Sequence, residues 1–237
     1  HRDLHSFPTR RSSDLRGRYI QFLDSDDVIH EEKFEIQLKL LKDHSENALS
    51  YCDYFTSTEE DLTSPFPLRY VSPMFESQNY LHELIIRWET TLSIPIHCFL
   101  FNSSFFKMMG IDFDETLSNH EDWDCWIRIF RLKPEVLFVD RKLATYRIRS
   151  GAMCYDIHAM RNGYVNAIKK RLLDSELATN EFSLLKRRYN IVRYGVNSVY
   201  SGVAMVLSPL YYTLSFTKKI LRDRKSTRLN SSHRIRS

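Results

Sequence analysis

The chain has 237 residues, which is long enough for one domain with a sizeable core. Hydrophobic residues make up 43% and charged residues 27% of it, which excludes an intrinsically disordered chain and fits a globular protein. No two of the four cysteines are spaced as a CxxC pair. We therefore expect four separate reduced thiols and neither a disulfide framework nor a zinc site.

Both ends of the chain resemble translated sequencing adaptors. The segments His5–Leu15 and Asp223–His233 each match, over eleven codons, the DNA of a common library adaptor. We therefore predict that 1–15 and 223–237 are artefacts and leave them out of the fold prediction. Without them the formal net charge falls from +4 to −1, with 26 basic and 27 acidic residues. We accordingly expect no nucleic-acid partner, although the basic C-terminal end would otherwise suggest one.

Between these ends, short apolar runs alternate with amphipathic segments, which predicts an α/β fold with a mixed sheet flanked by helices. Arg18–Leu23 is predicted to be a buried strand. In the helix predicted for His30–Lys42, Phe34, Leu38 and Leu41 share one apolar face. The other predicted strands are Ala48–Phe55, Ile96–Phe101, Val136–Val139 and Leu143–Arg147. The other predicted helices are Ser77–Trp88, Asn102–Met109, Glu121–Leu132, His158–Leu173 and Glu181–Tyr200, and Thr56–Pro73 is predicted to be a loop.

Three carboxylates stand directly after the first predicted strand, in Asp24-Ser25-Asp26-Asp27. Ligands collect at the carboxyl ends of strands in α/β sheets, and carboxylates this close repel one another unless a cation lies among them. Hard oxygen ligands suit Mg²⁺ or Mn²⁺, which usually also bind substrate phosphates. A solvated acidic turn before the following helix is the simpler interpretation, and these residues alone leave both open.

A phosphatase is a further alternative. The segment Phe22–Val28 fits the nucleophile pattern of haloacid-dehalogenase-type phosphatases, in which Asp24 would attack phosphorus and Asp26 would act as acid and base. A third alternative is a non-catalytic fragment that keeps only the fold.

A second acidic block distinguishes these alternatives. Gly17–Asp27 reads Gly-Arg-Tyr-Ile-Gln-Phe-Leu-Asp-Ser-Asp-Asp, and Phe113–Arg128 contains Phe-Asp-Glu-Thr-Leu and Glu-Asp-Trp-Asp-Cys-Trp-Ile-Arg. In order and spacing the two blocks resemble family-2 glycosyltransferases with the GT-A fold, and the resemblance covers roughly Gly17 to Arg149. A dehalogenase-type phosphatase does not predict the second block.

This resemblance implies an inverting transfer of a sugar from a UDP-, GDP- or dTDP-sugar to a hydroxyl acceptor. Asp122 would deprotonate the acceptor as general base, with Glu121 beside it in the catalytic pair. Asp26 and Asp27 would hold Mg²⁺ or Mn²⁺ in a DXD motif, and Asp24 would contact the nucleotide ribose or a nearby water. Ser118–Glu121 also has the pattern of a capping box, which would give Glu121 only the task of satisfying the helix start.

Five further residues have two interpretations each. Arg147, or Arg149 after it, would meet the diphosphate or stay on the surface. His97 would face the acceptor pocket or, as we favour, be structural. Trp123 and Trp126 are expected in the core rather than stacked on a sugar.

The resemblance places residues 16–150 in the C-terminal part of a catalytic domain whose first half is absent, so we expect this fragment to be inactive. Residues 151–222 are predicted to be a helical extension. Its segment Tyr194–Thr217 has no charged residue, and we expect it to attach peripherally to a membrane or to pack on the absent half. The implied setting is bacterial cell-surface polysaccharide synthesis with a saccharide or lipid-linked acceptor. The implied location is the cytoplasm, at the inner face of the plasma membrane.

Overall fold

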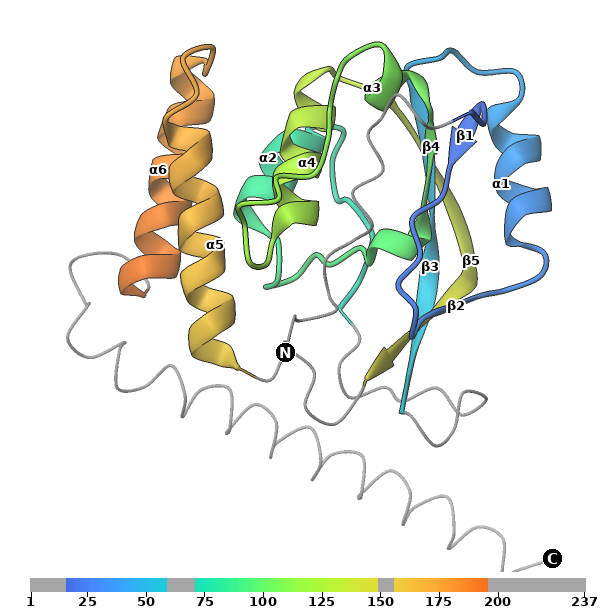
Figure 1. Cartoon of the computed structure of the whole chain (residues 1–237), viewed down its shortest axis with the longest axis horizontal. Coiled ribbons are helices and arrows are strands. Elements are labelled where there is room, and N and C mark those ends of the chain that lie inside the picture. Colours follow the sequence, from blue (N-terminus) through green and yellow to red (C-terminus); the bar gives the residue numbers. More distant parts are fainter. Residues whose placement is uncertain (1–15, 59–70, 149–155, 196–237) are drawn as a thin grey trace, which may run out of the picture. The chain divides into compact units, whose positions relative to one another are not determined.

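The protein contains one mixed five-stranded sheet with helices on both sides, as the computed structural model in Figure 1 shows. The structure describes residues 16–58, 71–148 and 156–195. The strand order is β1-β4-β3-β5-β2, in which β3 and β5 are parallel and the other neighbours are antiparallel. This confirms the predicted α/β class. The strands are β1 (Tyr19–Ile20), β2 (Val28–Ile29), β3 (Ala48–Thr58), β4 (Phe99–Asn102) and β5 (Glu135–Ile148).

The two long central strands determine where a site can form. β3 and β5 pair from Ala48↔Glu135 to Thr58↔Ile148, so their carboxyl ends lie at the same edge of the sheet. The register shifts on either side of Asp53, which marks a bulge. The sequence predicted two separate strands where the structure has the continuous β5, because the polar residues at this bulge interrupt its apolar pattern.

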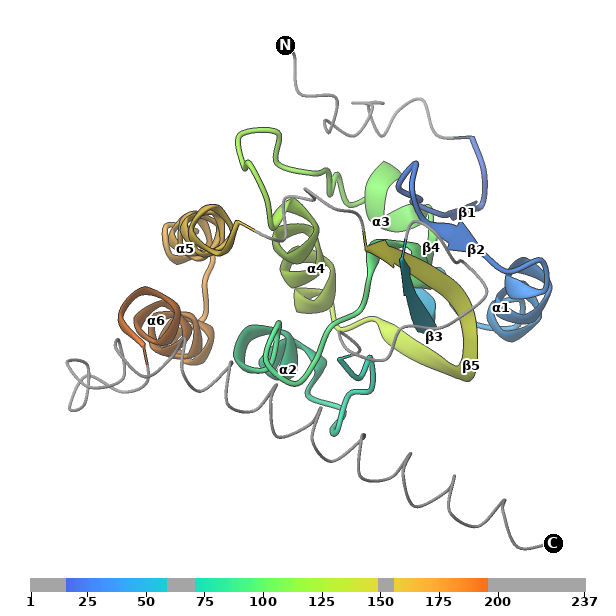
Figure 2. The same cartoon turned by 90° about the horizontal axis from the view of Figure 1, so that it is seen from below.

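Helices cover the two faces of the sheet unequally, as the view in Figure 2 shows. Helix α1 lies against one face, α2 and α4 lie against the other, and α5 lies beyond α4. The helices are α1 (Lys33–Leu41), α2 (Tyr80–Ile86), the 3-10 turn η3 (Ile96–Cys98), α3 (Ser104–Lys107), α4 (Glu121–Arg131), α5 (Ile157–Leu172) and α6 (Thr179–Tyr194).

Aromatic side chains fill the space between α4 and the sheet. The Trp126 ring lies 4.8 Å from that of Phe101 and 4.9 Å from that of Phe99, measured between centroids. Trp123 donates a hydrogen bond from Nε1 to the Leu84 carbonyl oxygen over 2.9 Å, which joins α4 to α2. Both tryptophans are fully buried, so the prediction that they belong to the core is confirmed.

Two predictions near the N-terminal part of the sheet are wrong in detail. The expected buried strand Arg18–Leu23 is only the two-residue edge strand β1, and Leu23 is 45% exposed. Helix α1 buries Leu41 of the expected apolar face, but it buries Lys33 and Gln37 in place of the other two members. Phe34 and Leu38 on that expected face are exposed. The buried polar pair is accommodated because Lys33 donates a hydrogen bond to the Phe99 carbonyl oxygen and Gln37 donates one to the Cys98 carbonyl oxygen.

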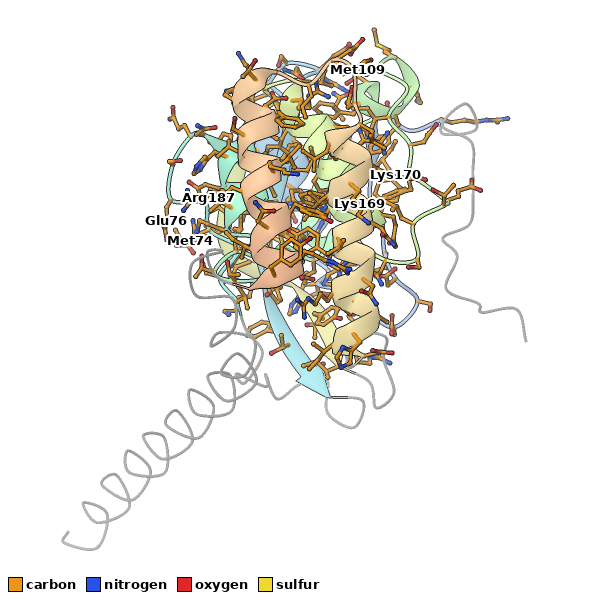
Figure 3. All side chains as sticks on the ribbon, turned by 90° about the vertical axis from the view of Figure 1, so that its left-hand side faces the viewer. Met74, Glu76, Met109, Lys169, Lys170 and Arg187 are labelled. Atoms are coloured by element: carbon orange, nitrogen blue, oxygen red, sulfur yellow. The ribbon has the colours of Figure 1, made fainter. Side chains whose placement is uncertain are left out.

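Helix α5 is tied to the body of the molecule by ion pairs. Asp124, fully buried on α4, lies 2.8 Å from Arg171 Nε of α5 and 3.2 Å from Arg128 Nε of α4 itself. Lys170 of α5, labelled in Figure 3, pairs with Asp114 in the second acidic block. Burial alone would raise the pKa of Asp114, but the bonds from Lys170 and Thr116 lower it to about 2.

The chain divides into two compact units. The first ends at Arg188 and contains the sheet, helices α1 to α5 and most of α6. Of the second, the structure describes only the end of α6 and Gly195, where the rings of Tyr189 and Tyr194 meet edge to face at 6.3 Å. The rest of the segment predicted as peripheral lies outside the described residues. Within them, no helix has the length and apolar character that a membrane span needs.

Candidate active site

The first acidic block forms a turn between β1 and β2. The Asp27 amide donates to the Asp24 carbonyl oxygen over 3.1 Å, which closes the turn. The acids therefore follow a loop. The sequence had predicted that they follow the end of a buried strand, and this prediction is wrong. They still lie at the edge of the sheet where β3 and β5 end, because Asp27 contacts Arg147, the residue before the last of strand β5.

Asp27 is the most enclosed of the three acids, and both of its carboxylate oxygens have a neighbour. Oδ1 accepts a hydrogen bond from the Arg147 amide over 2.8 Å, and Oδ2 lies 2.7 Å from His97 Nδ1. The His97 ring is fully buried and parallel to the Tyr146 ring, with centroids 6.3 Å apart. Asp27 and His97 thus join the acidic turn to β5 and η3, as the structural interpretation of His97 predicts.

Asp24 and Asp26 are more accessible than Asp27 and are half-buried. Burial, together with the carboxylates of Asp27, Asp26 and Glu121, raises the pKa of Asp24 to about 6, although His97 opposes them. The sequence separates Glu121 from Asp24 by almost a hundred residues. The Phe22 and Phe113 rings, one from each block, meet edge to face with 4.9 Å between their centroids, so the fold brings the two acidic blocks together.

The chemistry of this turn suits a divalent cation that also binds a phosphate-bearing ligand. The donors are carboxylate oxygens, and a carboxyl such as Asp24, whose ionised form is disfavoured by neighbouring carboxylates, gains most from a nearby cation. Among the described residues, no three His, Cys, Asp or Glu side chains form a ready-made metal site. Mg²⁺ commonly uses one or two carboxylates and completes its coordination with substrate phosphates and water.

The second acidic block begins α4 without the predicted capping box. His120, and not Ser118, is the residue before the helix, and no side chain caps the helix start. His120 has φ 61°, a left-handed conformation that is uncommon for a non-glycine residue. Glu121 therefore has no capping task. Burial and the Glu121 carboxylate raise the pKa of Asp122 to about 7, although His120 opposes them. A carboxyl with this pKa suits a general base at neutral pH.

A network of side chains holds His120 in this conformation. Its Nδ1 lies 2.6 Å from Asn119 Oδ1, and its Nε2 lies 3.0 Å from Glu89 Oε1. Its ring stacks on Tyr164 of α5 with 4.4 Å between centroids and 6° between planes. Asn119 donates from Nδ2 to the Ala159 carbonyl oxygen of α5 over 3.2 Å. The start of α4 is therefore positioned by α5.

Gly163 makes this contact between α5 and Asn119 possible. A methyl group at position 163 would collide with the Asn119 side chain. We expect Gly163→Ala to destabilise the fold by about 1–3 kcal/mol, because overpacking forces Asn119 away from His120. The same change in an Asn119→Ala background should instead stabilise by up to ~1 kcal/mol, since alanine is the better helix former. Urea unfolding of the four proteins measures both, and an equal effect in both backgrounds would contradict the contact.

The sequence did not predict the pairing of two polar residues behind the acidic turn, the buried Lys33 and the half-buried Gln21. Lys33 is fully buried and donates to Gln21 Oε1 and, over 3.4 Å, to the Phe99 carbonyl oxygen. Gln21 in turn donates to the His97 carbonyl oxygen over 3.1 Å. Burial lowers the pKa of Lys33 to about 8. These residues hold the strand before Asp24 against η3, and no local pattern in the sequence reveals their pairing.

Two pockets lie elsewhere on the first unit. One of about 270 Å³ is lined by aromatic residues such as Tyr51 and Phe138, beside Met74 and Glu76 in Figure 3. The other, of about 410 Å³, lies where α2, the end of α4 and the start of α6 meet. None of the site residues predicted from the sequence lines either pocket, so these pockets do not identify the reaction site. Arg149 lies outside the described residues.

The sequence relatives of this chain carry names of one class, the glycosyltransferases. No protein-family model matches the chain. An uncharacterized glycosyltransferase of Methanocaldococcus jannaschii is 24% identical over 224 residues, covering 92% of this chain and 68% of the relative. An uncharacterized glycosyltransferase of Rickettsia prowazekii is 31% identical over 124 residues, covering 50% of this chain and 36% of the relative.

The fold is similar to that of a protein whose structure was solved with a bound sugar nucleotide. The crystal structure of S. aureus TarS 1-349 in complex with UDP-GlcNAc aligns with a TM-score of 0.54 at 15% identity, covering 84% of this chain and 56% of TarS. The chain thus spans only part of these relatives. Sequence and fold together support a glycosyltransferase.

Proposed function

We propose that this chain carries the diphosphate-binding turn and the general base of an inverting, nucleotide-sugar-dependent glycosyltransferase with a GT-A fold. The observation that carries the proposal is the meeting of two acidic blocks, one with crowded carboxylates around Asp24 and one with a base-like carboxyl at Asp122. UDP-GlcNAc, the sugar nucleotide in the TarS complex, is the first donor to test. Since the chain spans part of its relatives, transfer is best assayed with the full-length product of its gene.

The proposed reaction moves one proton and exchanges one bond. The acceptor hydroxyl oxygen attacks the anomeric carbon of the sugar, and its proton passes to the Asp122 carboxylate. The bond between the anomeric carbon and the diphosphate oxygen breaks, and the nucleoside diphosphate leaves with the bonding electrons. Attack from the side opposite the leaving group inverts the anomeric centre, through a transition state with oxocarbenium character.

The residues of the acidic turn would divide the remaining tasks. Mg²⁺ or Mn²⁺, when bound, supplies charge that stabilises the departing diphosphate. Asp26 is the residue we propose to hold it, with Asp24 beside it toward the ribose. Asp27 was the second metal ligand expected from sequence, but its oxygens contact the Arg147 amide and His97. We therefore assign Asp27 to positioning the turn. The Arg147 side chain, next to this contact, is proposed to meet the diphosphate.

Substitution should separate these two tasks. We expect Asp26→Asn to weaken Mn²⁺-dependent UDP binding at least tenfold, about 1.4 kcal/mol, without lowering the melting temperature. Asp27→Asn should lower the melting temperature, because it weakens a buried contact with His97. Calorimetric titration with UDP and thermal unfolding measure the two effects, with exposed Asp43→Asn as the control. The assignment fails if Asp26→Asn binds UDP as the unaltered protein does.

The wider setting is also a proposal. Cell-surface polysaccharide synthesis, a saccharide or lipid-linked acceptor, and attachment at the inner face of the plasma membrane follow from the family resemblance. The decisive assay measures UDP released by the full-length product from UDP-GlcNAc and other UDP-, GDP- and dTDP-sugars. Release of phosphate from p-nitrophenyl phosphate that depends on Asp24, without sugar transfer, would instead favour the phosphatase. Absence of both activities would leave the non-catalytic alternative.

A further inference from the structure

We propose that His120 is held as an imidazolium cation beside Asp122 and keeps this base ionised, so that it sets the pH at which transfer begins. The inference rests on the proposed function for its catalytic consequence, but its structural part does not. His120 is a positioning residue, because it acts on the reaction only through Asp122.

The hydrogen bonds around the ring determine its protonation. Asn119 donates from Nδ2 to the Ala159 carbonyl oxygen, which fixes the orientation of the amide and turns Oδ1 toward His120. Oδ1 is an acceptor, so Nδ1 must carry a hydrogen. The Glu89 carboxylate is also an acceptor, so Nε2 must carry a second one. An imidazole with hydrogens on both nitrogens is a cation.

The charged and titratable groups around His120 favour this cation. Glu121 and Asp122 belong to the same helix start, Glu89 comes from the turn after α2, and Tyr164 comes from α5. Arg188 of α6 is a second cation, and its guanidinium carbon lies 5.3 Å from the Tyr164 ring centroid. Three carboxylates thus face two cations, and the His120 side chain is only 2% exposed. Water therefore screens the His120 end of these interactions little, whereas the Glu89 side chain is 40% exposed.

Two uncommon backbone conformations and one glycine hold His120 in this position. Both His120 and Glu89 have positive φ, at 61° and 57°, which is uncommon for such residues. Gly163 leaves the room that Asn119 needs to face the ring. Such strain persists only where surrounding contacts enforce it. The cation then opposes burial and Glu121, which both favour the protonated form of Asp122.

Two substitutions separate the charge of His120 from its shape. His120→Asn removes the cation and tolerates the left-handed backbone. His120→Lys keeps a cation, and Lys133 already adopts φ 51° in this protein. We expect His120→Asn to move the ascending limb of the rate–pH profile up by about one pH unit, which is about a tenfold lower rate on that limb. Rates should converge at high pH, where Asp122 is ionised in both proteins, and His120→Lys should keep most of the original profile. A structural role would impair both variants alike at every pH.

Nuclear magnetic resonance tests the inference without any transfer reaction. In the 237-residue chain at pH 7, both His120 ring nitrogens should give signals of protonated nitrogen, and the Asp122 carboxyl should titrate at higher pH in His120→Asn. His44→Asn is the matched control, because His44 Nδ1 also lies 2.8 Å from a carboxylate, that of Glu135, but on the surface. A neutral His120 ring, or an unshifted Asp122 titration in His120→Asn, overturns the inference. Lost transfer with these signals as expected would instead count against the proposed function.

Discussion

Asp122→Asn is expected to lower the rate of sugar transfer by about 10²–10⁴-fold, because a general base contributes about that factor. The asparagine has nearly the same shape but cannot accept the acceptor's proton. Donor binding should stay within about twofold, since Asp122 belongs to the helix start and not to the acidic turn. The measurement is UDP release by the full-length product under single-turnover conditions.

Stability should change in the opposite direction from activity. Burial and Glu121 raise the pKa of Asp122 to about 7, so its ionised form costs folding free energy. This loss of folding free energy begins as pH rises above about 4, the pKa of an unfolded aspartate. It reaches its full size above about 7. Asp122→Asn should therefore be no less stable than the unaltered protein at pH 8. Asp112→Asn, at an exposed residue just before the second acidic block, is the control, and equal activity of the two variants would remove Asp122 as the base.

Trp126→Ala is expected to destabilise the first unit by about 3–5 kcal/mol. The indole is fully buried between α4 and the sheet, in contact with the rings of Phe99 and Phe101. Truncation leaves a cavity among these rings that the sheet cannot collapse to fill. The free energy of unfolding in urea measures the loss.

Phe34→Ala is the matched control for this substitution. Phe34 is also aromatic but 40% exposed on α1, so its loss should cost less than about 1 kcal/mol. If Trp126 instead stacked on the sugar, Trp126→Ala would weaken donor binding and leave stability unchanged, which would contradict its place in the core.

The sequence predicted best those elements that local interactions stabilise or whose apolar residues recur at a regular spacing. Helix α4 was predicted one residue longer than it is, because its apolar positions recur at helical spacing and face the sheet. The face of α1 was predicted wrongly, because Lys33 and Gln37 are buried through bonds to residues distant in sequence. Single-sequence patterns assign lysine to the surface and cannot show such partners.

The sequence named candidate site residues but could not give their geometry. Two motifs identified Asp24, Asp26, Asp27 and Asp122, and the structure brings the two blocks together. The role of Asp27 depends on His97 and on the end of β5, which only the folded sheet places beside it. The predicted capping box does not form, because contacts with Asn119, Glu89 and Tyr164 hold His120 in a left-handed conformation. No pattern in the sequence predicted that Glu89 lies at this site.

Paramagnetic broadening by Mn²⁺ in the presence of UDP tests the central claim most directly, because it needs binding and not turnover. In the 237-residue chain, we expect UDP-dependent broadening of the amide signals of Asp24–Asp27, Arg147 and Glu121–Asp122, and its loss in Asp26→Asn. Broadening of both acidic blocks together would show that one nucleotide site joins them. Broadening confined to other residues, such as those around Tyr80 and Phe130, or none at saturating Mn²⁺ and UDP, would contradict a diphosphate site at this turn.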